Sequence, residues 1–382
     1  MRISHFTITL IISAILTGLA QQPLQLGWIA WFSLVPFIFI LNRIDSKKAY
    51  FKAGFIWGFV YYLTVIFWLA MNIGTTPLIG MISMLAAVLY CSLNIAVISL
   101  IMGFIKSYYA KRWFWLMPFV WTSVEYIRNM DVLTGGPWTS LANTQLDFHT
   151  LVQNAEISGI YGITFWIILL NVCIYNWIDR PYSKHLFSVV SIFILPWITG
   201  LYLTPNPQTD FKNKIDIALI QPNIHLSQKW KPGAIRQNIE SLLTLSKPEI
   251  EKSVDVVIWP ESATPAYILQ GNQYYLKWIQ SELGNTKLLS GIPYYTGEKE
   301  SRKFFNSAVL VSSDSVSKVY NKLMLVPMAE HIPLSGYFPS LKELNLGQAN
   351  FTHGDEYRLF NIQNTPFAAM ICFESTVPSL SA

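Results

Sequence analysis

Val254-Asp-Val-Val-Ile-Trp-Pro260 is a short apolar run that ends at a proline, and Glu261 follows it directly. An apolar run of this length between turn residues predicts a strand buried in a sheet. Outward from it, similar runs alternate with amphipathic stretches, which is typical of an α/β domain. We expect further strands at 215–221, 287–293, 306–312, 316–320 and 367–372, and helices at 232–245 and 274–283.

Three reactive side chains lie at or beyond the ends of these expected strands, where α/β domains tend to hold their active residues. Glu261 follows the first strand and Lys322 follows Tyr320-Asn321, while Cys372 closes the last strand. A thiol becomes a nucleophile once a base takes its proton, a carboxylate can be that base, and an ammonium can stabilise an oxyanion. Taken singly, each has a plainer interpretation, since strands often end in a charge and a lone cysteine is usually core. Together they indicate nucleophilic catalysis.

The N-terminal half has a different composition. The chain of 382 residues is 52% hydrophobic and 13% charged, about half the charge of an ordinary soluble domain. Residues 1–208 carry 11 Lys/Arg and 6 Asp/Glu, whereas residues 209–382 carry 16 of each. We therefore expect a membrane domain over 1–204 and a soluble domain over 205–382. Because the basic excess belongs to the membrane part, it gives no indication of a nucleic-acid partner.

Seven apolar segments precede residue 205, which predicts about seven membrane helices. Basic residues gather on alternate connections between them. Since positive connections stay in the cytoplasm, we expect the N-terminus inside and everything after the seventh segment outside. The segments are 6–20, 27–42, 53–71, 79–105, 113–127, 159–178 and 186–204, and the basic connections hold Arg43, Lys47, Lys48, Lys52, Lys106, Lys111, Arg112, Arg180 and Lys184.

The connection between the fifth and sixth segments holds Glu125 and Arg128, which are spaced to share a helix face and pair. An ionisable residue beside a membrane span is a functional candidate, although a purely structural ion pair is the simpler interpretation. Three cysteines are too few for a disulfide framework, and Cys91 and Cys173 are expected to be buried in apolar runs. The six histidines lack ligand spacing, so we expect no metal and no cofactor.

Three motifs of the soluble half resemble the Glu, Lys and Cys motifs of the carbon–nitrogen hydrolase (nitrilase) superfamily. They are Ile258-Trp-Pro-Glu261-Ser-Ala-Thr-Pro265, Tyr320-Asn-Lys322-Leu-Met-Leu-Val-Pro327-Met-Ala-Glu330-His-Ile-Pro333 and Ile371-Cys372-Phe-Glu374-Ser375. With the membrane half, the chain resembles the apolipoprotein N-acyltransferase family. The stretch from Gln221 to Trp230 and the pattern Trp121…Glu125…Arg128…Gly-Pro-Trp138…Gly159-Ile-Tyr-Gly162 carry the same resemblance.

This resemblance implies a multi-span helical membrane domain followed by an extracytoplasmic α/β nitrilase-like domain, an αββα sandwich, in the bacterial inner membrane. It implies that Cys372 attacks a phospholipid ester and forms a thioester acyl-enzyme, with Glu261 as general base and Lys322 stabilising the oxyanion. The acyl chain would then pass to the N-terminal α-amine of a diacylglyceryl-cysteine apolipoprotein, the last step of lipoprotein maturation.

The resemblance also implies supporting roles for Trp230, Glu330 and Glu374, and it places Phe373 where some members have tyrosine. That difference removes a hydroxyl and keeps the ring. The apolar stretch 323–339 follows Lys322, and we expect it to dip into the bilayer or to shield the thioester from water; simple coverage of the core is the alternative.

The family normally continues well past the nucleophile, whereas this chain ends at Ala382. We therefore expect 205–382 to build only about the first two-thirds of a nitrilase-like domain, with unpaired strands, poor stability and weak or absent activity of the chain alone.

Other functions remain open on these residues. A membrane-tethered amidase would use the same three side chains with water as acceptor. An inactive pseudoenzyme is a second alternative. Transport is a third, although no charge relay is visible beyond Glu125 and Arg128.

Overall fold

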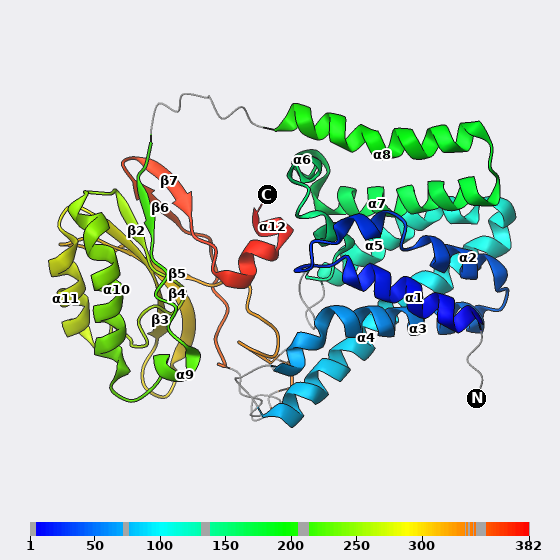
Figure 1. Cartoon of the computed structure of the whole chain (residues 1–382). Coiled ribbons are helices and arrows are strands. Elements are labelled where there is room, and N and C mark those ends of the chain that lie inside the picture. The colour runs from blue at the N-terminus through cyan, green and yellow to red at the C-terminus, as the bar shows by residue number, and fades with distance from the viewer. Residues whose placement is uncertain are drawn as a thin grey trace. The chain divides into compact units, whose positions relative to one another are not determined.

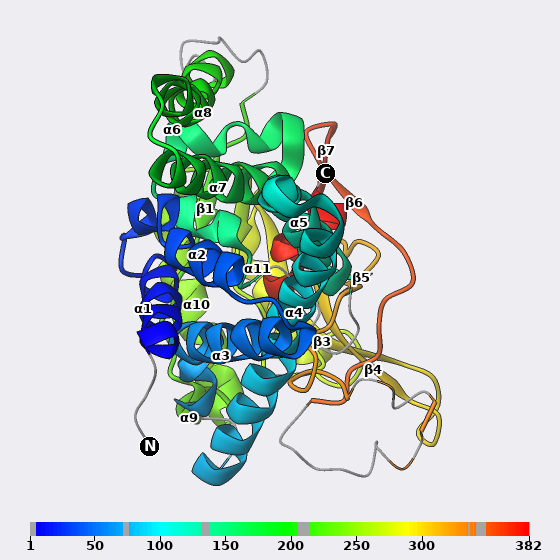
Figure 2. The same cartoon turned by 90° about the vertical axis from the view of Figure 1, so that its right-hand side faces the viewer.

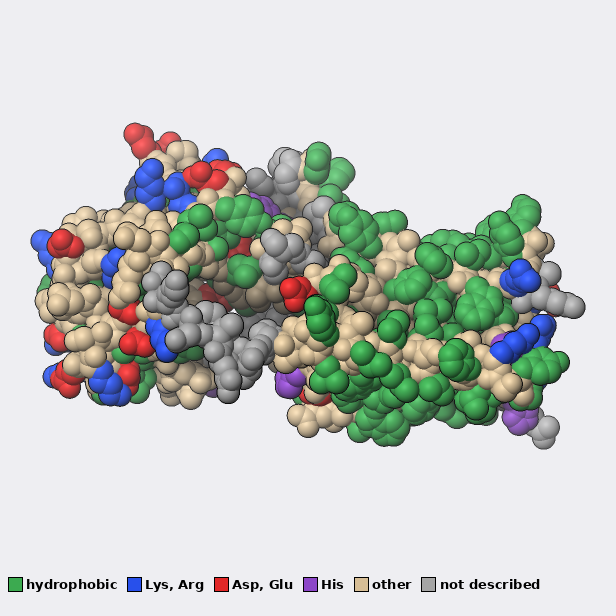
Figure 3. Space-filling view, turned by 90° about the horizontal axis from the view of Figure 1, so that it is seen from above, with side chains coloured by type: hydrophobic (Ala, Val, Ile, Leu, Met, Phe, Trp, Pro, Cys, Tyr) green, Lys and Arg blue, Asp and Glu red, His purple; other side chains and the backbone are tan. Residues whose placement is uncertain are grey.

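A computed structural model describes residues 5–71, 76–130, 138–204, 214–332, 334, 337–338, 340 and 349–381. The chain divides into two compact units, Met1–Pro207 and Gln208–Ala382. We call them the helical unit and the α/β unit. One face of each unit is seen in Figure 3, where hydrophobic side chains cover much of the helical unit and charged side chains dot the α/β unit.

The helical unit contains four helices that are long and apolar enough to cross a membrane, counted over the described residues. These spans are Lys47–Met71, Pro77–Tyr109, Ala155–Asp179 and Ser183–Leu203. The first and fifth expected segments form shorter helices, and the second begins with a 3-10 turn (Figures 1 and 2). The elements are α1 His5–Leu19, η1 Gly27–Trp31, α2 Val35–Arg43, α3 Lys47–Ile66, η2 Phe67–Met71, α4 Pro77–Tyr109, η3 Ala110–Leu116, α5 Met117–Asn129, η4 Leu141–Gln145, α6 His149–Val152, α7 Ala155–Asp179 and α8 Ser183–Leu203.

Small residues allow α3 and α4 to pack closely. A Cβ on Gly54 would lie 2.3 Å from the Ser99 hydroxyl, and a Cβ on Gly103 would lie 2.7 Å from the Tyr50 ring. Helices in lipid associate through such close packing, because lipid supplies no hydrophobic drive between them. The expected burial of Cys91 and Cys173 is confirmed.

The irregular backbone between η1 and α2 is satisfied by an internal side chain. Asn171 of α7 accepts a hydrogen bond from Leu34 N at 2.9 Å and donates to Ala30 O at 2.8 Å. Non-helical backbone at membrane depth needs such partners, because hydrocarbon offers none. The polar residue inside the apolar span α7 therefore has a structural function.

The α/β unit is built on a five-stranded sheet in the order β1-β2-β3-β4-β5. The first three strands run parallel, and β4 and β5 are antiparallel to their neighbours. Helices α10 and α11 cover one face (Figure 1), and the β6–β7 hairpin packs on the other. The elements are β1 Ile217–Leu219, α9 Leu226–Lys229, α10 Ala234–Glu251, β2 Val256–Ile258, α11 Gln273–Leu283, β3 Lys287–Thr296, β4 Lys303–Val311, β5 Tyr320–Asn321, β6 Leu359–Ile362, β7 Thr365–Ala368, η6 Cys372–Thr376 and α12 Pro378–Ser381.

Alternation of side chains along each strand divides this unit into two cores. Val257 and Leu288 face α10 and α11, whereas Val256 and Leu289 face the hairpin. Both faces are thus covered, which explains why the parallel strands are apolar runs. The expected mixed helix-and-strand character of this half is confirmed.

One strand prediction is wrong. The strand expected over 367–372 ends at Ala368, where it is paired with β6, and Cys372 instead begins the 3-10 turn η6. The strand expected over 316–320 is reduced to Tyr320–Asn321 and an isolated bridge at Val316. An apolar run shows that residues are buried, and it does not show whether a neighbouring strand is present to pair with them.

Candidate functional site

The structure brings Glu261, Lys322 and Cys372 together in the α/β unit. Glu261 follows β2 and Lys322 follows β5. The Lys322 ammonium lies 3.5 Å from Glu261 Oε1, and both of these charges act on the Cys372 thiol. A carboxylate, an ammonium and a thiol that interact in this way are the groups needed to generate and use a thiolate nucleophile.

A close backbone contact positions the Glu261 turn. Gly291 of β3 lies beneath it, and a Cβ there would be 2.7 Å from Glu261 Cα and from Pro260 O. Ala263 N donates to Gly291 O at 2.9 Å, and Ser262 adopts a positive φ of 49°. The turn therefore rests directly on the backbone of the neighbouring strand, which fixes where its carboxylate points.

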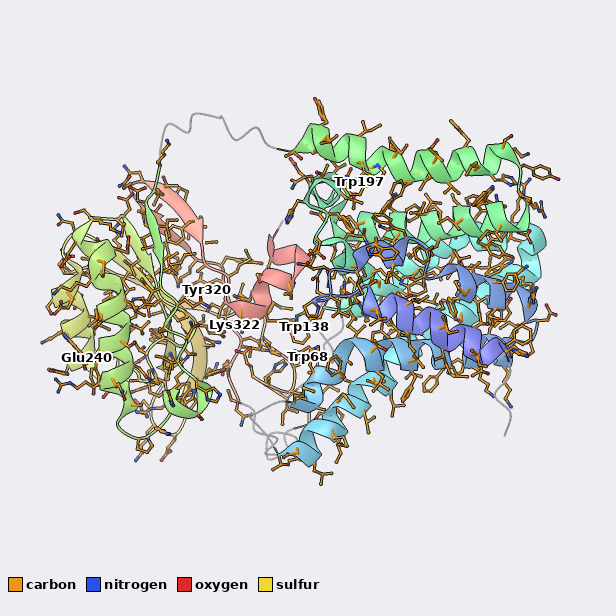
Figure 4. All side chains as sticks on the ribbon, in the orientation of Figure 1. Trp68, Trp138, Trp197, Glu240, Tyr320 and Lys322 are labelled. Atoms are coloured by element: carbon orange, nitrogen blue, oxygen red, sulfur yellow. The ribbon has the colours of Figure 1, made fainter. Side chains whose placement is uncertain are left out.

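Lys322 is a fully buried cation. Figure 4 labels it beside Tyr320 at the end of β5. Its side chain is 0% exposed and lies 2.9 Å from Glu330 Oε2 and 3.5 Å from Glu261 Oε1. Removing an ammonium from water is costly unless opposite charges surround it. Two carboxylates compensate this one, so the sequence-predicted Glu330 is a direct partner of Lys322.

Asn306 is a site residue that the sequence analysis missed. Its Nδ2 donates to Glu261 Oε1 at 2.5 Å and to Glu330 Oε1 at 2.8 Å. It lies inside β4 and is 3% exposed. A buried polar residue in the interior of an apolar strand was the signal available, because buried amides require partners.

The Glu374 carboxyl connects the cysteine turn to the lysine strand. Its Oε2 accepts from Ile371 N at 2.8 Å, next to Cys372. Its Oε1 accepts from the Tyr320 hydroxyl at 2.8 Å, from Leu323 N at 2.6 Å and from Met324 N at 3.2 Å. Glu374 is 0% exposed, so these four donors replace water around the carboxyl.

Cys372 occupies an unusual backbone conformation. Its φ is 52° and the side chain is exposed. Non-glycine residues in the left-handed region are uncommon, and they occur often at functional sites. Partial burial of the sulfur and the neighbouring Glu261 charge raise the pKa of the thiol, while the Lys322 ammonium and the Phe373 N–H lower it in part. The proton therefore stays on sulfur until a base removes it.

A return segment, residues 349–354, borders the loop that carries Glu330. Phe351 N donates to Glu330 O at 2.8 Å and Gly354 N donates to Lys322 O at 2.8 Å. The His353 Nδ1 lies 2.8 Å from Leu323 O, and its ring contacts that of His331 at 4.8 Å between centroids. These contacts hold both ends of the loop. Of the apolar stretch 323–339, residues 333, 335, 336 and 339 lie outside the described residues.

Trp230 and Phe373, the other two predicted site residues, differ in exposure. Phe373 is 3% exposed and packs into the unit next to Cys372. Trp230 follows α9, is 54% exposed, and has the Lys229 ammonium 6.0 Å from its ring centroid. Trp230 is thus available at the surface of the α/β unit, whereas Phe373 is part of its interior.

Glu125 and Arg128 form a buried ion pair in the helical unit. Arg128 Nη2 lies 3.7 Å from Glu125 Oε1, and Arg128 Nη1 donates to the Tyr62 hydroxyl at 2.8 Å. Glu125 also accepts from Leu141 N at 3.0 Å. The pair therefore anchors the start of η4. Within the quoted pattern, Gly135-Gly-Pro137 lie outside the described residues, and Trp138 packs against Trp68 at 6.0 Å (Figure 4).

Among the described residues, no three or more His, Cys, Asp or Glu side chains are grouped so that they could hold a metal ion.

Comparison with known proteins gives two adjoining family matches. The family model for the apolipoprotein N-acyltransferase N-terminal domain matches residues 13–173, and the carbon–nitrogen hydrolase model matches residues 216–382. The chain is 29% identical to the apolipoprotein N-acyltransferase of Geobacter metallireducens, over 97% of this chain and 73% of that protein. It is 24% identical to that of Chlorobaculum tepidum, over 96% and 74%, and 29% identical to that of Haemophilus ducreyi, over 93% and 71%.

Among solved structures, a glutamine-dependent NAD+ synthetase from Acinetobacter baumannii is similar at 18% identity and a TM-score of 0.27, over 40% of this chain and 29% of that one.

The contribution of the four hydrogen bonds to Glu374 can be tested by Glu374→Gln. This variant places an amide NH₂, which is itself a donor, among the groups that donate to Glu374. We expect the free energy of unfolding to fall by about 1–3 kcal/mol, the cost of leaving buried donors unpaired. Chemical unfolding in detergent measures this, with the exposed Glu282→Gln on α11 as the matched control. Equal stability of the two variants would show that the four hydrogen bonds contribute nothing net.

Loss of the Glu261 charge is expected to make the Cys372 thiol more reactive toward alkylation, even though Glu261 is the candidate base. Because the Glu261 charge raises the pKa of Cys372, Glu261→Gln lowers that pKa, and the thiol alkylates faster at a fixed pH near 8. The pH dependence of the iodoacetamide reaction measures the shift. The exposed Glu240→Gln on α10 (Figure 4) should leave it unchanged, and an unaltered or raised pKa in Glu261→Gln contradicts the coupling.

Proposed function

Because the chain belongs to the apolipoprotein N-acyltransferase family, we propose that it transfers a fatty acyl chain from a phospholipid to the N-terminal α-amine of a diacylglyceryl-cysteine apolipoprotein, with Cys372 as nucleophile. The observation that carries the proposal is the grouping of three reactive side chains: Lys322 Nζ lies 3.5 Å from Glu261 Oε1, and both of their charges act on the Cys372 thiol. These side chains can perform both halves of a ping-pong reaction.

In the first half, Glu261 accepts the thiol proton, and the thiolate attacks the carbonyl carbon of the phospholipid ester. Lys322 stabilises the oxyanion of the tetrahedral intermediate. Collapse of that intermediate breaks the ester C–O bond, and Glu261 returns its proton to the leaving glycerol oxygen. The products are a lysophospholipid and an acyl thioester on Cys372.

In the second half, the α-amine of the acceptor attacks the thioester carbonyl. Glu261 takes the proton that the amine loses as the C–N bond forms, and Lys322 again faces the oxyanion. The C–S bond then breaks, the amide leaves, and the proton returns from Glu261 to sulfur. Glu261 therefore takes up and releases one proton in each half of the reaction. Neither half needs a cofactor.

The raised pKa of Cys372 suits this sequence. A thiol that stays protonated at rest resists oxidation and stray acylation. Its activation then depends on transfer of the proton to Glu261, the carboxylate whose charge acts on the thiol. Asn306 and Glu330, which contact Glu261 and Lys322 respectively, would keep the two groups in place.

Removal of the nucleophile tests the function directly. We expect Cys372→Ala to lower acyl transfer by about 10⁴-fold or more and to abolish the labelled thioester formed from a phospholipid with a radioactive acyl chain. Cys173→Ala, which changes a buried cysteine of the helical unit, is the matched control.

Two results of that assay would contradict the proposal. Turnover of small amides without a fatty acyl thioester would identify a hydrolase. Failure of the unaltered protein to form the thioester would indicate an inactive member of the family.

We further propose that the protein lies in the bacterial inner membrane with the α/β unit outside the cytoplasm. The charge pattern supports this, and so does one contact inside the helical unit. The Lys106 ammonium donates to Asn42 O at 2.8 Å and to Ile44 O at 2.9 Å. Two basic connections, one after α2 and one after α4, thus lie at the same end of the unit, as the positive-inside rule requires.

Cysteine labelling with a membrane-impermeant maleimide tests this topology. In a Cys372→Ala background, Ser281→Cys on α11 should react in cells stripped of their outer membrane, whereas Lys48→Cys on α3 should react only after permeabilisation. Both sites are exposed in the structure, so access depends on the side of the membrane. Labelling of Lys48→Cys in sealed cells would reverse the assignment.

A further inference from the structure

A second lysine lies beside the catalytic carboxylate. Lys229 ends α9, and its ammonium donates to the main-chain oxygen of Glu261 at 3.2 Å. Its own backbone is held from two sides, because Lys229 N donates to His225 O at 3.1 Å and Asn238 Nδ2 of α10 donates to Lys229 O at 2.9 Å. The backbone of Lys229 is therefore fixed, and its ammonium is held at the Glu261 turn by the hydrogen bond to Glu261 O.

The environment of Lys229 differs from that of Lys322. Lys322 is fully enclosed and faces two carboxylates, whereas Lys229 is half-buried. Within the described residues, Lys229 forms no ion pair within 4.0 Å, and its ammonium has one hydrogen bond, to Glu261 O. An ammonium has three N–H donors. Two donors at the edge of the site are thus available to a ligand.

The charge balance of the site indicates which ligand. Lys322, Glu261 and Glu330 lie in contact, and their formal charges sum to one negative charge. That cluster repels an anion. A phospholipid donor carries a phosphodiester anion a few bonds from the ester that Cys372 would attack, whereas the diacylglyceryl acceptor carries no phosphate. An anionic donor therefore needs a cation outside this cluster, and lysine is a regular phosphate ligand.

We propose that Lys229 binds the phosphate of the phospholipid donor and so acts as a substrate-binding residue in acyl-enzyme formation alone. This inference rests on the proposed function of the site. Burial lowers the pKa of Lys229, and a bound phosphodiester would raise it by replacing lost water with a negative charge. The exposed ring of Trp230 lies beside the Lys229 ammonium. This edge of the site therefore offers an apolar surface next to a cation.

The test compares two acyl donors, one with a phosphodiester headgroup and one without it. Thioester formation on Cys372 is followed with phosphatidylglycerol and with the corresponding diacylglycerol, each in neutral maltoside micelles, so that the donor supplies the sole phosphate. For Lys229→Gln we expect the KM for phosphatidylglycerol to rise about tenfold or more, the loss of one charge-assisted hydrogen bond. The KM for diacylglycerol and the rate of transfer from preformed acyl-enzyme to acceptor should stay unchanged.

Two further variants sharpen the comparison. Lys229→Arg keeps the charge and should restore most of the affinity for phosphatidylglycerol. Lys231→Gln removes an exposed lysine two residues away and should leave both donors unaffected.

An equal loss with both donors would mean that Lys229 only supports the Glu261 turn, and an unchanged KM for phosphatidylglycerol would mean that it does not touch the donor. Either result overturns the inference while the acyltransferase function stands. If the unaltered protein forms no thioester from either donor, the proposed function fails, and this inference fails with it.

Discussion

The arrangement of the site depends on one buried carboxyl. Glu374 accepts hydrogen bonds from Ile371 N next to Cys372 and from Leu323 N and Met324 N beyond Lys322. These segments are about fifty residues apart in the chain, and they belong to a hairpin end and to a short edge strand. Since a carboxyl without water must satisfy its oxygens with donors at fixed directions, one side chain sets the separation of Cys372 and Lys322.

The second constraint is the balance of charge around Lys322. A fully buried ammonium is stable only with compensating carboxylates, and Glu330 and Glu261 supply them. The side-chain amide of Asn306 lies between these two carboxylates and donates a hydrogen bond to each. This arrangement leaves Glu261 3.5 Å from the ammonium, with a charge that also acts on the Cys372 thiol. It also gives the cluster a net negative formal charge, which repels anions.

Buried polar groups of the helical unit also have internal hydrogen-bond partners, here in a lipid environment. Its buried polar groups, among them Asn171 and the Glu125–Arg128 pair, bond to irregular backbone at η1 and η4. Lipid provides no hydrogen bonds, so every break in a helix requires an internal partner. Polar residues within apolar segments are therefore explained here by the backbone they satisfy.

The sequence by itself determined the division into an apolar helical half and an α/β half, and it determined Glu261, Lys322 and Cys372 as candidates. Those signals are local, because burial, strand-forming runs and reactive residues at their ends are all visible along the chain. Only the tertiary structure decided that Cys372 begins a turn with a φ of 52°, that Glu374 connects two segments, and that Asn306 and Lys229 belong to the site. Each of these depends on contacts between residues distant in the chain, and a pattern of neighbours carries no information about which strand ends meet in space.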